Sequence, residues 1–119
     1  MTPRAPNGTK APGRALWKAI TEEFELGEHE LVLLRQVVHT ADLCADLQAI
    51  VDGEGVLLDR AGAPPRPHPA AVELRMQRVL LARLIVALRV PLGDEDAAAG
   101  GRTQVRALRG VYGLPAARS

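Results

Sequence analysis

Aromatic residues, cysteines and long apolar runs are all scarce in this chain of 119 residues. The aromatic side chains are Trp17, Phe24 and Tyr112 alone. A core must therefore be built from Leu, Val, Ile and Ala, which favours helices that meet along aliphatic seams over a sandwich of sheets. The single cysteine, Cys44, excludes a disulfide within the chain and is typical of a protein from the reducing cytoplasm.

The longest apolar runs, residues 79–82 and 84–88, are far shorter than the ~20 residues that cross a bilayer. We therefore expect no membrane span and no membrane partner. The first dozen residues contain prolines and glycines where a secretory signal would need an apolar stretch, so export is not expected either.

Charge is segregated along the chain although the formal net charge is only +1. Residues 1–18 carry four bases and no acid, whereas residues 19–30 carry five glutamates and no base. Such blocks favour polyanionic or charged protein partners. The basic residues are mostly arginine, which a GC-rich coding bias would also produce, so both explanations stay open for any single arginine.

Apolar spacing predicts a short helix and then a long one. Leu16, Ile20 and Phe24 recur every four residues, which indicates an amphipathic helix that begins near Arg14. A second helix is predicted over residues 29–52, where two apolar stripes with heptad-like spacing cover too wide an arc for one neighbouring helix. The main stripe consists of Leu33, Val37, Thr40, Cys44, Leu47 and Val51.

A third helix is predicted from Pro69 to Arg89, because His68-Pro69 is typical of a helix start and Pro91 stops helices. It too has two apolar faces, which implies two partners. One face contains Leu74, Leu81, Leu84, Ile85 and Leu88, and the other contains Val72, Val79, Val86 and Val90.

The predicted fold is mainly α, with a central antiparallel helical hairpin, a short amino-terminal helix, a small extended or β element between the hairpin helices, and flexible termini. The small element falls within residues 55–67, where three prolines would confine any return strand to an edge. We expect a flexible basic arm over residues 1–13, a helical core over 14–92 that oligomerises, and a flexible tail over 93–119.

The sequence offers little for catalysis, and we expect neither a metal nor another cofactor. His29, His39 and His68 lack the spacing of metal ligands, and no glycine-rich loop follows a strand. Asp42 and Asp46 lie one helical turn apart, as paired carboxylates in acid–base sites do. The simpler interpretation is that they form surface ion pairs with arginines of the second or third helix, namely Arg35, Arg75 or Arg78.

The order of short motifs resembles the small subunits of phage terminases. The resemblance covers about residues 13 to 92, and the ending over residues 109–114 is similar to a short ending of such proteins. The motifs that carry it are Gly13-Arg14-Ala15-Leu16-Trp17, Phe24-Glu25-Leu26, Glu28-His29-Glu30-Leu31, Thr40-Ala41-Asp42, His68-Pro69-Ala70, Glu73-Leu74-Arg75 and Leu80-Leu81-Ala82-Arg83-Leu84.

The resemblance implies a non-catalytic component of DNA packaging in the host cytoplasm. Such subunits form an oligomeric ring, bind the viral double-stranded DNA and recruit the terminase large subunit, which carries the ATPase and nuclease. Nothing in this chain resembles the separate helix-turn-helix domain of some small subunits, so recognition of a specific site by this chain alone is not expected. A small helical interaction protein without a DNA role, such as an adaptor or an antitoxin-like partner, is the alternative.

Three sets of residues are our candidates for these roles. The expected DNA contacts are Arg4, Lys10, Arg14, Lys18, Arg75, Arg78 and Arg89. The expected oligomerisation residues are Leu33, Val37, Cys44, Leu47, Val51, Leu74, Leu81, Leu84 and Leu88. The expected docking residues for the large subunit are Arg106, Arg109, Val111, Tyr112 and Leu114.

Overall fold

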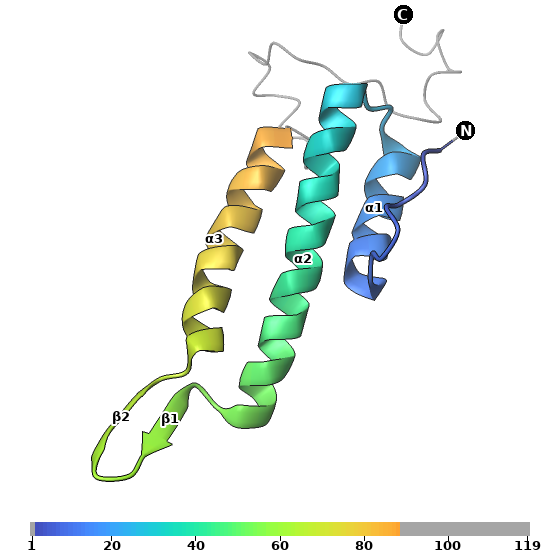
Figure 1. The fold of residues 1–119 in the computed structure, drawn as a ribbon. Helices are drawn as coiled ribbons and strands as arrows, with labels where there is room; N and C mark the ends of the chain where they lie inside the picture. Colours follow the sequence, from blue (N-terminus) through green and yellow to red (C-terminus); the bar gives the residue numbers. More distant parts are fainter. Residues whose placement is uncertain (1, 89–119) are drawn as a thin grey trace, which may run out of the picture.

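The computed structural model describes residues 2–88, which form three helices and one β-hairpin (Figure 1). The mainly helical fold class predicted from the sequence is confirmed, including the small β element between the long helices. In chain order the elements are α1 (Ala11–Glu23), α2 (Glu28–Glu54), β1 (Leu57–Arg60), β2 (Ala63–Pro67) and α3 (Pro69–Leu88).

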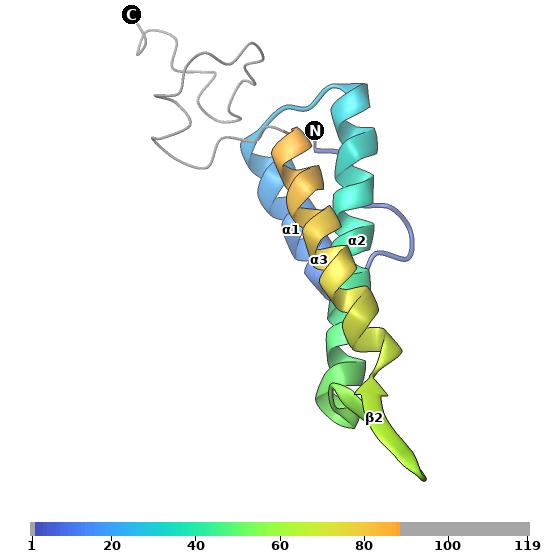
Figure 2. The same ribbon diagram turned by 90° about the vertical axis from the view of Figure 1, so that its left-hand side faces the viewer.

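The two long helices form the antiparallel hairpin, and α1 packs on α2 near its amino-terminal end (Figure 1). The upper part of the molecule therefore has three helices, whereas the lower part has only α2 and α3. Figure 2 shows the β-hairpin projecting from the lower end.

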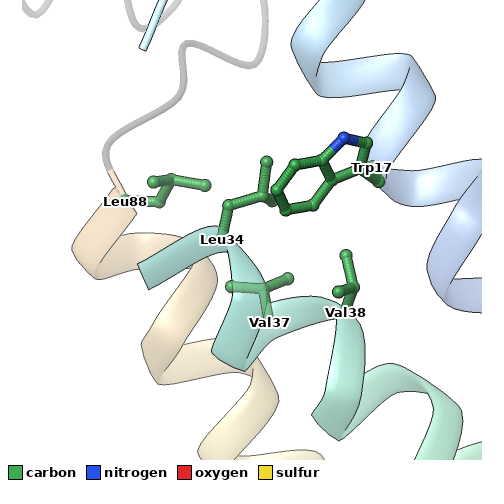
Figure 3. Close-up of a cluster of buried hydrophobic side chains, with 5 residues drawn as sticks. All are labelled: Trp17, Leu34, Val37, Val38 and Leu88. Atoms are coloured by element: carbon green, nitrogen blue, oxygen red, sulfur yellow. The ribbon is translucent and has the colours of Figure 1, made fainter. Parts of the chain in front are cut away.

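The main core lies where all three helices meet. Trp17 reaches from α1 toward Leu34 of α2, and Leu88 approaches from α3 (Figure 3). Val37 and Val38 complete this cluster, and the side chains of all five are almost fully buried. Burial of one such aliphatic side chain contributes about 1.5–3 kcal/mol. This cluster therefore fixes how α1 sits on the hairpin.

A second, smaller core joins α2 and α3 near the β-hairpin. It consists of Val51, Ala70 and Leu74, with Cys44 and Leu47 packed against it. No helix covers this region from outside in the described part of the chain, so its residues are less thoroughly buried than those beside Trp17.

The turn of the β-hairpin and the edge position of β2 follow from the glycine and prolines in their sequence. Gly62 adopts a positive φ of 69° at the turn, which glycine tolerates and most residues do not. The three prolines of β2 lack N–H donors, so this strand is confined to an edge, and Leu57 pairs with Pro67 at the open end of the ladder. The edge position predicted for this strand is confirmed.

Candidate interaction surfaces

The start of α1 is held by a carboxylate from α2. Asp42 is buried, and its two oxygens accept hydrogen bonds from the backbone N–H groups of Lys10 and Gly13, both at 2.7 Å. These are two of the free donors that every helix amino terminus presents, so Asp42 serves as a helix cap supplied from a distance. The positive end of the helix dipole also favours this negative charge.

Gly13 is required at this position by the closeness of the cap. A Cβ atom added there would lie 2.7 Å from Asp42 Oδ1 and 2.8 Å from the Thr9 methyl carbon. A larger residue would therefore push the carboxylate away from the two N–H groups that it binds.

The segment before α1 is packed against the helices. The indole N–H of Trp17 donates to the carbonyl of Pro3 at 2.9 Å, and Thr9 is buried in a turn with Pro6. The sequence predicts a flexible arm over residues 1–13 and a helix from near Arg14, whereas α1 begins at Ala11. The composition of this segment is typical of a loop, but Asp42 and Trp17 give it specific partners that composition does not reveal.

Asp46 forms an exposed ion pair one turn beyond the cap. Lys10 Nζ lies 2.6 Å from Asp46 Oδ2, and the pKa of Lys10 is raised by this hydrogen bond and by the charge of Asp46. The two carboxylates that could suggest acid–base chemistry therefore both bind groups at the start of α1. The expected pairing of Asp42 and Asp46 with arginines is wrong: in the described part of the chain the two carboxylates bind Lys10 and Gly13, and Arg35 lies near Glu28.

The predicted DNA contacts separate into two groups. Arg14 and Lys18 lie one turn apart on α1, and Lys10 is the N-cap residue just before it, so these three exposed bases form a basic row that begins at the amino terminus of the helix. Arg75 and Arg78 are exposed on α3 instead, on the other side of α2 (Figure 1). Arg4 is exposed in the segment before α1.

Several of these bases have partners within the chain. The Arg14 guanidinium donates to the carbonyl of Thr9, and that of Arg78 donates to the Gln48 side chain. Arg89 and the five proposed docking residues beyond it lie outside the described residues.

The residues proposed for oligomerisation contribute mainly to contacts within one copy. Val37, Val51, Leu74 and Leu88 are buried in the two cores, and the other five are partly buried and pack against them. Heptad spacing correctly shows that these residues share a face, but α3 or α2 of the same chain covers that face. These nine residues therefore form the contact between α2 and α3 of one chain, which we call the hairpin seam.

A different set of apolar side chains is exposed on α3. Val72, Met76, Val79 and Val86 recur at intervals of four, three and seven residues, so they lie within about 80° of arc on one side of the helix. Their exposed fractions run from 39% at Val72 to 74% at Val86. We call these four residues the outer face of α3. It points away from the hairpin seam, which agrees with the second apolar face expected for this helix.

A groove borders this outer face. It has a volume of about 430 Å³ and an apolar floor that includes Val51, Val56 and Leu74, with Arg75 and Arg78 among its lining residues. Val79 belongs both to the groove and to the outer face of α3. The two features are therefore one continuous surface that is apolar and flanked by positive charge.

The long helix α2 exposes a second apolar line. Val32, Leu43 and Ile50 lie within about 20° of arc and are 40–50% exposed. We call these three residues the outer face of α2. The helix that carries it holds six acidic residues and one arginine, whereas α3 holds three arginines and one glutamate.

The base of the β-hairpin is fixed by His68. The Ala70 N–H donates to His68 Nδ1 at 3.0 Å, so the ring proton sits on Nε2, which lies 2.7 Å from Glu54 Oε1. The backbone N–H of His68 also donates a hydrogen bond to the Val56 carbonyl at 2.8 Å. The His68 side chain thus caps the start of α3 and also contacts Glu54 at the end of α2.

Within residues 2–88, no three His, Cys, Asp or Glu side chains lie close enough together to hold a metal ion. Cys44 is half-buried, and burial raises the pKa of its thiol while the nearby Arg78 charge opposes that rise. None of the helices in that part of the chain combines the length and the hydropathy that a membrane span requires.

Comparison of the chain with family models, with curated proteins and with solved structures yields no match.

Proposed function

We propose that this chain is a non-catalytic assembly protein of the terminase small subunit type, which self-associates, binds double-stranded DNA in the host cytoplasm and recruits a large subunit. The observation that carries the proposal is the outer face of α3. Four large apolar side chains at helical spacing remain in water along most of the helix in a single copy. Soluble monomers rarely leave such a stripe uncovered.

The basic row on α1 supports the DNA part of the proposal. Arg14 and Lys18 are exposed one turn apart on α1, Lys10 is exposed just before the helix, and Arg4 is exposed nearby in sequence. A row of this kind can contact successive phosphates without reading bases, which fits binding that is not specific for sequence.

The test is the salt dependence of binding to duplex DNA. We expect log K to fall linearly with log salt, and Lys18→Gln to flatten the slope by about one because one phosphate contact is lost. Arg66→Gln is the matched control, since it removes one exposed charge from β2, away from α1. Undetectable binding, or binding that salt does not weaken, would contradict the DNA role.

A helical interaction protein without DNA binding is the second candidate, and one observation favours it. Lys10 and Arg14 are engaged by Asp46 and by the Thr9 carbonyl, as residues with a structural role would be. This candidate predicts that the Lys18→Gln variant behaves like the unchanged protein in every binding assay, because the basic row then serves only to hold the start of α1.

A further inference from the structure

We propose that the outer face of α3 in one copy docks on the outer face of α2 in the next copy, so that copies associate head to tail. This inference deepens the proposed function, on which it rests, because it names the two surfaces and the partner. The partner is a second copy of this chain. An interface between two different surfaces produces rings when its rotation closes and filaments when it does not.

The two faces are complementary in charge. Arg83 lies within the arc of the outer face of α3, Arg75 lies about 20° beyond its edge, and Arg78 lies farther round toward α2; all three are exposed. On α2, Asp46 and Glu54 lie within about 40° of the outer face, and their side chains are 50% and 61% exposed. Within the described residues each forms an ion pair through one carboxylate oxygen, Oδ2 of Asp46 and Oε1 of Glu54, so the other oxygen remains for a base of another copy.

Charge also disfavours a symmetric contact, in which the same face of two copies would meet. Two α3 faces brought together would place Arg75 and Arg83 of each copy against those of the other. Two α2 faces would bring their flanking carboxylates together in the same way. Repulsion of this kind suppresses wrong pairings at interfaces, so the contact between an α3 face and an α2 face is favoured over either symmetric contact.

The spacing of the two faces also agrees. Leu43 and Ile50 are seven residues apart, as are Val72 and Val79, so each pair spans about 10.5 Å along its helix. Repeats of equal length let side chains of one helix fit between those of the other over two turns. The groove beside Val79 supplies room for an aliphatic side chain of the neighbouring copy.

A mixing experiment tests this arrangement with the full chain. Val79→Asp removes the α3 surface and Ile50→Asp removes the α2 surface, while each variant keeps the other surface intact. Both side chains are about half exposed in one copy, so neither change disturbs a core. Leu57→Asp is the matched control, because it places the same charge at an exposed leucine on β1. Trp17 emission and far-ultraviolet circular dichroism report whether each variant retains its fold.

We expect each face variant to sediment as a monomer and the Leu57→Asp control to assemble like the unchanged chain. An equimolar mixture of the two face variants should form a heterodimer and nothing larger, since one intact α3 face and one intact α2 face remain. Assembly of Ile50→Asp at the unchanged size, or a mixture that stays monomeric up to its solubility limit, overturns the head-to-tail contact.

The failure of this inference can be told apart from the failure of the proposed function. A chain that assembles but does not bind DNA contradicts the DNA role and leaves the contact standing. A chain that binds DNA in a salt-dependent way, but whose Val79→Asp variant assembles normally, contradicts the contact alone. An unchanged chain that is monomeric contradicts both the contact and the assembly role, because a segment of its own or a different partner would then cover α3.

Discussion

The part of the molecule where three helices meet and the part with two helices are built from the same kinds of residue, yet they bury them differently. Leu34 in the upper part is fully buried between α1 and α3, whereas Leu74 in the lower part retains 5% exposure in a core of three residues. The difference is the presence of α1 and of Trp17. The lesson is that a two-helix hairpin rich in Leu and Val leaves faces uncovered wherever no third element packs on it.

The largest effect we expect comes from truncating a leucine in each part. Leu34→Ala should lower the free energy of unfolding by about 4–5 kcal/mol, because the surrounding three helices cannot collapse into the cavity. Leu74→Ala should cost about 2–3 kcal/mol, since its surroundings are open to water on one side. Urea unfolding followed by circular dichroism measures both values. Equal costs would contradict the contrast between the two parts.

The cap on α1 should be the next most sensitive feature. Asp42→Ala leaves the buried backbone N–H of Gly13 and the partly buried one of Lys10 without their acceptor and should cost about 1–3 kcal/mol. Asp46→Ala removes only an exposed ion pair and should have a clearly smaller effect. Urea unfolding followed by Trp17 emission measures both variants. Similar losses for the two would show that Asp42 does not act as a cap.

Gly13→Ala tests the same cap from the side of the helix. Alanine favours helices over glycine by about 1 kcal/mol at an unobstructed site. Here the added Cβ would meet Asp42 Oδ1 at 2.7 Å, so we expect a loss of stability by thermal unfolding. In the Asp42→Ala background the same substitution should be neutral or stabilising. A stabilising Gly13→Ala in the unchanged protein would count against the close approach.

In the two-helix part, we expect His68 to contribute less to the free energy of unfolding than the cap on α1 does. His68→Ala removes the cap of α3 and the contact with Glu54 and should cost about 1 kcal/mol. His68→Asn retains a capping acceptor, so it should recover most of that loss in the same unfolding measurement. If asparagine is no better than alanine, the contact with Glu54 outweighs the cap.

The smallest effect we expect is on the reactivity of Cys44. Because its pKa is raised, a smaller fraction of the thiol is ionised at mildly alkaline pH than in an unhindered thiol, so alkylation should be slower and should accelerate at higher pH than usual. Arg78→Gln removes the charge that opposes this rise and should slow alkylation further. Faster alkylation in that variant would contradict the assignment.

The local features of the fold were predictable because their causes lie close together in the sequence. Pro69 marked the start of α3, and Gly62 with the prolines of β2 marked the hairpin. Heptad spacing also identified the residues of the seam. It could not show that the partner across the seam is the same chain, because a spacing pattern describes one helix and carries no information about which helix covers it.

The contacts that organise the amino-terminal end could not be predicted for a related reason. Asp42 is separated from Lys10 by 32 residues, and nothing in either local sequence indicates that they meet. The pairing depends on how α1 docks, which the packing of Trp17 on Leu34 and Val38 decides. One clue to this contact becomes visible only with the structure. The helix α1 begins at Ala11 and has no capping side chain of its own, so a distant residue must supply the cap.

The mass of the full chain in solution tests the central claim most directly. Sedimentation equilibrium over a range of concentrations should give a multiple of 12.7 kDa for the unchanged protein, and Val79→Asp should reduce it to the mass of one copy. An unchanged protein that stays at the mass of one copy throughout would contradict the claim that the outer face of α3 exists to be covered by another copy.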